Sequence, residues 1–158
     1  MKRLVYVETT VISFLTARKS RDVVLAGQQE ATRRWWDQRR EEFDLYISSV
    51  VIDEAGKGDS RAAKKRMAAL AGISVIAPTD EMRELAVKFI EEQGIPPKAA
   101  DDALHLAVAT VSRVQFLLTW NMKHLCSPSQ KERLHEICQA AGYTSPIICT
   151  PFDLLAEA

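Results

Sequence analysis

The chain has 158 residues, of which 47% are hydrophobic, so it can bury one core and its length predicts a single domain over residues 1–158. Its 21 basic and 21 acidic side chains cancel, which excludes a generally basic nucleic-acid-binding protein and leaves only a local basic patch to meet such a partner. No stretch reaches the roughly 18 apolar residues of a membrane span, and three cysteines without a CxxC pair favour a reducing, cytoplasmic setting.

The first half of the chain predicts two strands separated by a helix. The apolar run LVYV at residues 4–7 predicts a buried strand that stops at Glu8. A long amphipathic helix is predicted from Ser20, its N-cap, to Glu42. A second strand follows at residues 45–49, and VVIDEAG then predicts a short helix that ends at glycine and carries Glu54.

The rest of the chain continues the alternation of strands and helices. We predict helices at 59–71, 79–93, 98–112 and 128–141, and strands at 73–77, 116–118 and an edge strand at 147–149. Such alternation implies right-handed crossovers that cover both faces of the sheet. The predicted fold class is therefore α/β, a three-layer α/β/α sandwich with a mostly parallel central sheet of four to five strands.

Four polar residues stand where an open parallel sheet places its functional crevice, beyond the carboxyl ends of the strands. Glu8 and Asn121 follow predicted strands, and they meet if these strands are neighbours. Glu54 and Asp102 lie in helices that start or end near the same crevice. Carboxylates this close repel each other, and a hard divalent cation such as Mg²⁺ or Mn²⁺ would relieve the conflict. Taken singly, each acid is more simply a helix cap or a surface charge.

Four segments together resemble the PIN-domain family, and in particular VapC-type toxins, over nearly the whole chain. YVETT carries the first acid of the family onto Glu8, with Thr9 supporting that acid or a metal-bound water. SSVVIDEA carries the second onto Glu54, with its neighbour Asp53 as the less favoured alternative. The most specific segment, AADDALHLAVA, gives Asp102, with Asp101 capping the helix or backing the site. LLTWNMKHL gives Asn121 at the fourth position, beside Thr119.

The resemblance implies a Mg²⁺- or Mn²⁺-dependent endoribonuclease, the toxin of a type II toxin–antitoxin pair. Glu8, Glu54 and Asp102 would hold the metal, with Asn121 as an auxiliary catalytic residue. A small antitoxin protein and a homodimer or higher oligomer are the implied partners besides RNA. The first acid is Glu8 where Asp is commoner, and Asn121 stands where many members have an acid. These departures motivate an alternative, a catalytically weak PIN-like module that binds RNA or a protein without cleaving.

Basic and aromatic residues outside the acidic set allow two interpretations each. Lys57, Arg61, Lys64 and Lys65, together with Arg66, could guide the RNA backbone or simply form a solvated helix face. Trp35 and Trp36 favour packing over base stacking. His105 could be a general base, but we favour a packed, hydrogen-bonded histidine.

Competing chemistries lack their motifs. No GxGxxG or GxxxxGK[ST] segment provides a phosphate cradle. A phosphatase that forms an aspartyl-phosphate would need Asp directly after the first strand, where Glu8 stands. The pairs His124 with Cys126 and His135 with Cys138 do not make the four ligands of a structural zinc site.

Overall fold

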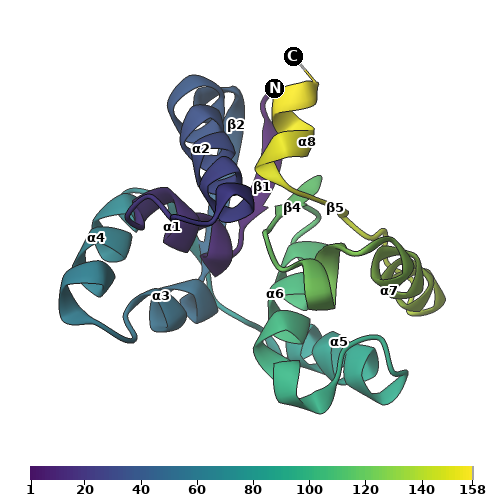
Figure 1. Ribbon diagram of the computed structural model, residues 1–158. Coiled ribbons are helices and arrows are strands. Elements are labelled where there is room, and N and C mark those ends of the chain that lie inside the picture. The colour runs from purple at the N-terminus through teal and green to yellow at the C-terminus, as the bar shows by residue number, and fades with distance from the viewer. Residues whose placement is uncertain (158) are drawn as a thin grey trace.

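A five-stranded, wholly parallel sheet forms the centre of the computed structural model, which describes residues 1–157 (Figure 1). The strand order is β3-β2-β1-β4-β5. The strands are β1 (Arg3–Val7), β2 (Phe43–Ser48), β3 (Ser74–Ile76), β4 (Phe116–Leu118) and β5 (Ile147–Cys149). The predicted α/β sandwich is confirmed, and β4 and β5 have the predicted bounds.

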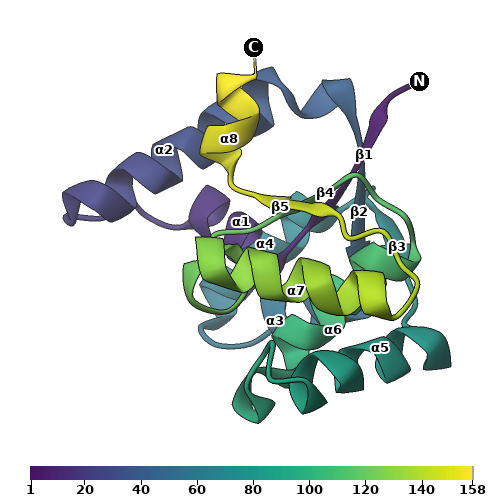
Figure 2. The same ribbon diagram turned by 90° about the vertical axis from the view of Figure 1, so that its right-hand side faces the viewer.

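Helices lie on both sides of this sheet. Their bounds are α1 (Thr9–Thr16), α2 (Val23–Gln38), α3 (Ser49–Ala55), α4 (Ser60–Leu70), α5 (Asp80–Glu91), α6 (Ala100–Val111), α7 (Pro128–Ala140) and α8 (Pro151–Ala156). Figure 2 shows α2 and α8 above the sheet and α5, α6 and α7 below it. The chain therefore has the three layers that right-handed crossovers between parallel strands require.

The middle of the sheet is the most deeply buried part of the fold. Val5, Tyr6 and Val7 on β1 are 0% exposed because helices cover both faces of the strand. The edge strands differ: Val75 on β3 and Ile147 on β5 are exposed. Burial therefore falls from the centre of the sheet to its edges, and the central strands end where helices from both layers meet.

Helix α1 is the largest departure from the sequence-based prediction. Residues 9–16 form a helix directly after β1, and the Glu8 carboxylate caps it by accepting a hydrogen bond from the Thr10 amide. Thr9, Thr10, Val11 and Ile12 are β-branched, and such residues have low intrinsic helix propensity. Val11 and Ile12 are 0% exposed, so burial outweighs propensity here.

Two further helix boundaries correct the prediction. Helix α2 starts at Val23, with the Asp22 side chain rather than Ser20 capping it, and ends at Gln38 before a separate turn at Arg40–Glu42. Helix α8 was not predicted. The Thr150 hydroxyl and the Asp153 carboxylate form a reciprocal capping box at its start, followed by Pro151 in the first turn.

Trp35 and the three cysteines are buried. Trp35 is 0% exposed and packs against Trp36 and Phe43, so the packing interpretation holds for it. The three cysteines are free thiols and are buried.

In residues 1–157, no helix combines the length and the apolar character that crossing a bilayer demands.

Candidate active site

The sheet brings Glu8 and Thr119 together. Strands β1 and β4 are paired in register, with Val7 opposite Leu118, and the Glu8 amide donates to the Leu118 carbonyl at 3.0 Å. Strand β2 pairs with one edge of β1, and β4 pairs with the opposite edge. The carboxyl ends of β1 and β4 therefore form the topological switch point, where open α/β sheets bind ligands.

Glu8 is buried, and its carboxylate is held by three donors. Oε1 accepts from the hydroxyls of Thr10 and Thr119, each at 2.5 Å, and Oε2 accepts from the Thr10 amide at 3.0 Å. The Thr119 hydroxyl in turn accepts from the Asn121 amide. Glu8 is only 2% exposed, and these bonds replace the water that it loses. Thr10, not Thr9, is the threonine that supports this acid.

Glu54 is held beside Glu8 by two other donors. Helix α3 starts immediately after β2 and carries Glu54 in its last turn. Glu54 Oε1 accepts from the Thr9 hydroxyl at 2.7 Å and lies 2.5 Å from His105 Nε2. Burial alone would raise the pKa of Glu54, but the hydrogen bond from His105, the charge of that ring and the Thr9 bond together lower it. Glu54 therefore stays ionised.

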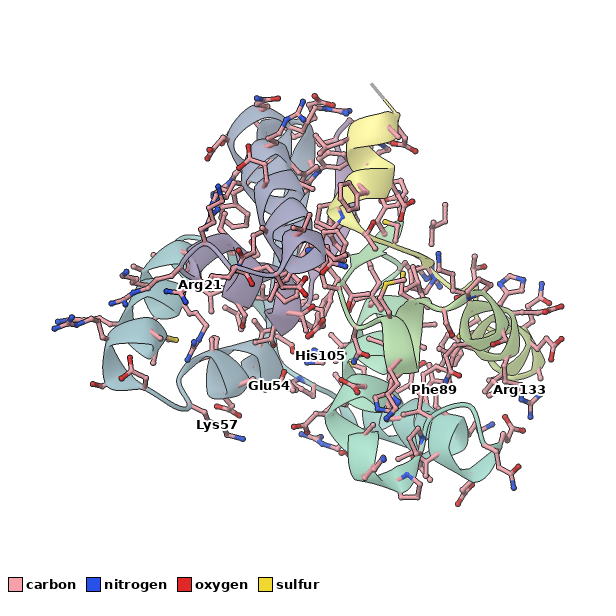
Figure 3. The ribbon with its side chains drawn as sticks, in the orientation of Figure 1. Arg21, Glu54, Lys57, Phe89, His105 and Arg133 are labelled. Atoms are coloured by element: carbon pink, nitrogen blue, oxygen red, sulfur yellow. The ribbon has the colours of Figure 1, made fainter. Side chains whose placement is uncertain are left out.

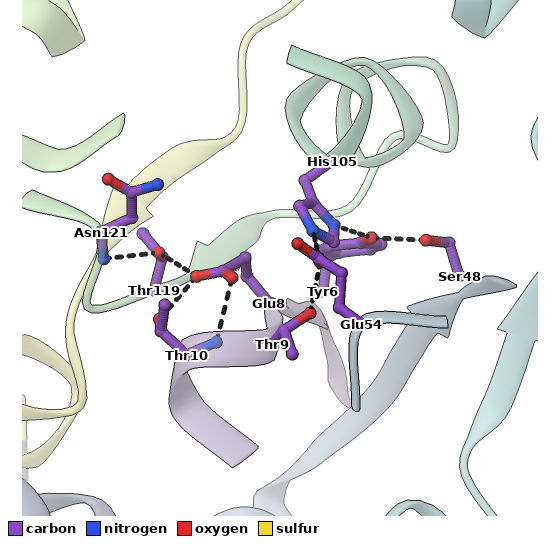
Figure 4. Close-up of polar contacts among 9 residues, drawn as sticks. All are labelled: Tyr6, Glu8, Thr9, Thr10, Ser48, Glu54, His105, Thr119 and Asn121. Carbon is purple, nitrogen blue, oxygen red and sulfur yellow. Dashed lines mark hydrogen bonds and ion pairs between the residues drawn. The ribbon is translucent and has the colours of Figure 1, made fainter. Parts of the chain in front are cut away.

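His105 connects this carboxylate to the core. It is 0% exposed, and its Nδ1 lies 2.7 Å from the Tyr6 hydroxyl, which lies 2.7 Å from Ser48 Oγ (Figure 4). Burial disfavours the charged ring, yet Glu54, with the charges of Glu8 and Asp102, raises the pKa of His105. Burial also raises the pKa of Tyr6 strongly, so the phenol keeps its proton. The predicted packed, hydrogen-bonded histidine is confirmed.

Asp102 lies near this group, one turn before His105 on α6. It lines a hollow of about 360 Å³ together with Glu54, Lys98 and Asp101. Burial raises the pKa of the Asp102 carboxyl; the Asn121 side chain and the charges of His105 and His124 oppose the rise, and Glu54 adds to it. The protein therefore does not fully compensate the negative charge of Asp102.

The remaining predicted site residues occupy supporting or peripheral places. Asn121 Oδ1 accepts from the His124 amide at 3.0 Å, so this oxygen is already used by the backbone. Asp101 is exposed in the first turn of α6, and it is not the cap, because the capping position is Ala99 without a side-chain bond. Asp53, the neighbour of Glu54, is exposed.

The most compact set of possible metal ligands consists of Glu8, Glu54 and His105. One ligand atom from each lies within 4.8 Å of the others, and within residues 1–157 this is the set that meets that geometry. Asp102 does not belong to this set, although its charge raises the pKa of His105 and the charge of Glu54 raises the pKa of Asp102. In Figure 3, Glu54 and His105 lie side by side near the centre of the molecule. Glu8 and Glu54 thus lie together, with His105 in the place where the sequence predicts Asp102, and hydrogen bonds stabilise the charges of both carboxylates.

Comparisons with known proteins identify the family and the fold of the chain. Residues 5–121, which include all four predicted acid or amide positions, match the family described as PIN domain. The chain belongs to the PIN-domain family. No curated protein sequence matches it significantly.

Solved structures share the PIN fold over most of both chains. VapBC2 from Rickettsia felis, bound to a DNA fragment from its promoter, is 12% identical, with a TM-score of 0.58 over 93% of this chain and 98% of that one. VapC20 of Mycobacterium tuberculosis, a toxin that cleaves the sarcin–ricin loop, is 17% identical, with a TM-score of 0.56 over 89% and 96%. VapBC-1 from nontypeable Haemophilus influenzae is 14% identical, with a TM-score of 0.58 over 94% and 98%.

The predicted RNA-binding residues lie on α4 and in the turn that precedes it. Lys57, Arg61, Lys64 and Lys65 are all exposed, and the last three share the outer face of α4. Lys57 is close enough to Glu54 for its charge to lower the pKa of that acid. Arg66 does not belong with them, because its guanidinium donates to the carbonyl oxygens of Ala55 and Lys57 and fixes the turn between α3 and α4.

A larger hollow, of about 690 Å³, lies at the opposite end of the sheet. It is lined by residues such as Val114 and Gln115, which precede β4, and Ile147, which starts β5. Ligands of α/β sheets bind beyond the carboxyl ends of strands, and this hollow is at the amino ends. Its size does not make it the active site of the PIN domain.

Sequence reasoning missed three side chains of the site: Thr10, which bonds to Glu8, and Tyr6 and Ser48, which are linked to Glu54 through His105. Thr10 was hidden because α1 was not predicted, although a threonine pair directly after the first acid was visible in ETT. Tyr6 reads as one more apolar strand residue, and Ser48 as the end of β2. Nothing in their spacing shows that α6 brings His105 to the Tyr6 hydroxyl, which also contacts Ser48, because these contacts depend on how three distant segments pack.

Proposed function

We propose that this PIN domain is a metal-dependent endoribonuclease of VapC type, the toxin of a type II toxin–antitoxin pair. The observation that carries the proposal is the position of Glu8 and Glu54, whose carboxylates meet at the switch point of the sheet with Asp102 close by. A site built for folding alone has no use for three acids in one crevice, since each of them loses solvation there.

The donor set fits a hard divalent cation. Glu54 Oε2 has no protein hydrogen bond among the described contacts, and Glu8 Oε2 has a single one. Asp102 contributes a carboxylate whose raised pKa would fall on binding a cation. Carboxylate oxygens with open positions for water are what Mg²⁺ and Mn²⁺ take.

The protein's own groups would orient the substrate and keep the site charged. A bound metal would supply Lewis-acid activation of the phosphate and of the attacking water. Thr10 and Thr119 keep Glu8 in place, and His105 with Thr9 keeps Glu54 in place. Lys57 and the outer face of α4 offer positive charge for the RNA backbone. No covalent intermediate on the protein is needed.

The proposed partners follow from the structural likeness. Two of the similar structures are VapBC assemblies of a toxin and its antitoxin. We propose a small antitoxin that covers the acidic crevice and places an arginine there, which pairs with the carboxylates in place of the metal. A homodimer or higher oligomer and a cytoplasmic location belong to the same proposal.

A second candidate is a PIN module that binds RNA or a protein without cleaving it. Two observations favour it: the Asn121 oxygen is engaged by the backbone, and three protein donors already satisfy Glu8. Both features reduce the need for a cation relative to a site with four free acids.

One cleavage assay separates the two candidates. Purified protein is incubated with structured RNAs with and without Mn²⁺, and Asp102→Asn is compared with Asp53→Asn, which removes the same charge from an exposed position. The nuclease predicts Mn²⁺-dependent cleavage that falls at least about 100-fold in Asp102→Asn and persists in Asp53→Asn. RNA binding without cleavage by the wild-type protein would favour the binding module.

A further inference from the structure

A buried chain of polar groups runs from the core to the proposed metal site. Ser48 ends β2, Tyr6 lies on β1, His105 on α6 and Glu54 on α3, and consecutive members are 2.7, 2.7 and 2.5 Å apart. Ser48, Tyr6 and His105 are each 0% exposed. A buried network of this kind is costly unless every member has a partner, so its geometry is tightly fixed.

The two oxygens of Glu54 are used unequally. Oε1 accepts from both the Thr9 hydroxyl and His105 Nε2, which fills its two lone-pair positions. Oε2 has no partner among the described residues. Figure 4 shows Glu54 held between His105 and Thr9, with Glu8 beside it. The carboxylate of Glu54 therefore cannot rotate freely, and Oε2 is the oxygen that remains to bind a cation.

We propose that His105 is a positioning residue for the metal. The Tyr6 hydroxyl, itself in contact with Ser48, orients His105, which bonds to Oε1 of Glu54 and so leaves Oε2 as the one oxygen that binds the metal. This inference rests on the proposed function, because it needs a cation at the site. His105 does not itself touch the metal, since its Nε2 is spent on Glu54 and its Nδ1 on Tyr6.

The Tyr6 hydroxyl is the part of the chain that can be removed most cleanly. Tyr6→Phe keeps the ring in the core and removes the partner of His105 Nδ1, which frees the imidazole to rotate. Outer partners of metal ligands typically contribute about 10- to 100-fold in affinity. We expect Mn²⁺ to bind about 10-fold more weakly to Tyr6→Phe and up to about 100-fold more weakly to His105→Leu.

Two variants separate positioning from general stability. His105→Gln retains an N–H that can reach Glu54, so its affinity for Mn²⁺ should lie closer to wild type than that of His105→Leu. Thr110→Val removes a buried hydroxyl from the same helix, where Thr110 Oγ1 bonds only to the Leu106 carbonyl and the Cys138 thiol. It should lower the unfolding temperature without changing the affinity.

The experiment is a titration of the full chain with Mn²⁺, followed by electron paramagnetic resonance, with the unfolding temperature measured for each variant. Weaker binding in Tyr6→Phe and His105→Leu, with recovery in His105→Gln and none of the loss in Thr110→Val, supports the proposal. Wild-type affinity in Tyr6→Phe and His105→Leu overturns it, as does a histidine-nitrogen coupling to bound Mn²⁺ that disappears in His105→Leu. If the wild-type protein binds no Mn²⁺, the proposed function fails and this inference with it.

Discussion

At the scale of single residues, hydroxyl groups decide how two acids share one crevice. Glu8 is 2% exposed and would be unstable as an isolated buried charge. Three donors from Thr10 and Thr119 make its burial tolerable, and Thr9 performs the same service for Glu54. The threonines therefore stabilise the buried carboxylates of the folded protein without a bound cation.

The Thr119 hydroxyl gives a direct test of this role. Thr119→Val keeps the shape of the side chain but leaves Glu8 Oε1 without one donor and the Asn121 amide without its acceptor. We expect the free energy of unfolding to fall by about 1–3 kcal/mol, measured by urea denaturation. Thr119→Ser keeps the hydroxyl and serves as the control. An equal loss in both variants would show that the methyl group, not the hydroxyl, matters.

The Glu54–His105 pair sets a pH dependence of folding stability. The raised pKa of His105 gives stability that is complete below about 6.5 and is lost as pH rises through the raised value. The lowered pKa of Glu54 gives stability that is complete above 4.5 and is lost as pH falls through the lowered value. In metal-free protein the pair therefore stabilises the fold most between these two limits.

Urea unfolding in the presence of a chelator tests this expectation. The unfolding free energy of the wild-type protein should fall as pH rises above about 6.5, and His105→Gln should lack this part of the decline. Asp102 has a raised pKa, so its own contribution also falls as pH rises from 3.8 through that value. Parallel curves for the two proteins above neutral pH would contradict the ion pair.

At the scale of elements, helix ends and strand ends place the chemistry. The sequence reveals most of these elements because their signals are local: apolar runs give β1, β4 and β5, and Asp59 and Thr79 cap α4 and α5 through their own side chains. Helix α1 escapes such reading because its β-branched residues favour strands and only burial makes them helical.

The site is readable from the sequence only in part, for the same physical reason. Residues that follow a strand, such as Glu8, are placed by topology once the sheet is known. The direction in which a side chain points depends on contacts between segments far apart in the sequence. That Asn121 turns its oxygen to the His124 amide, and that Thr9 serves Glu54 rather than Glu8, could not be inferred from spacing.

The outer face of α4 gives a prediction at this scale. Lys64 and Lys65 are exposed on it, so Lys64→Glu combined with Lys65→Glu should weaken RNA binding in an Asp102→Asn background. For single-stranded RNA, each lost phosphate contact should reduce the slope of log K against log salt by about 0.7. Arg83→Glu combined with Lys88→Glu makes the same charge change on α5. Equal effects of both pairs would leave α4 as a solvated face.

At the scale of the whole molecule, the site joins parts of the chain that are far apart in the sequence. Glu8 ends β1, Glu54 belongs to α3, and Asp102 and His105 belong to α6 in the other helical layer (Figure 1). Strand β4, which brings Thr119 to Glu8, is more than 100 residues from β1, since the two bonded residues are 111 apart. The acids therefore meet only when the complete sheet has formed.

Binding of a cation should for this reason be linked to global unfolding. A ligand that binds only the folded state adds about 2.7 kcal/mol at a hundredfold excess over its Kd, on the order of 5 to 10 °C in Tm for a chain of this size. We expect Mn²⁺ to raise the Tm of the wild-type protein and of Asp53→Asn, and a chelator to reverse the rise. Asp102→Asn should lose most of the shift, because it removes a proposed ligand, while Asp53→Asn removes the same charge from an exposed neighbour of Glu54. An equal shift in both variants would place the cation away from Asp102, and an equal shift in Glu54→Gln as well would place it outside the crevice altogether.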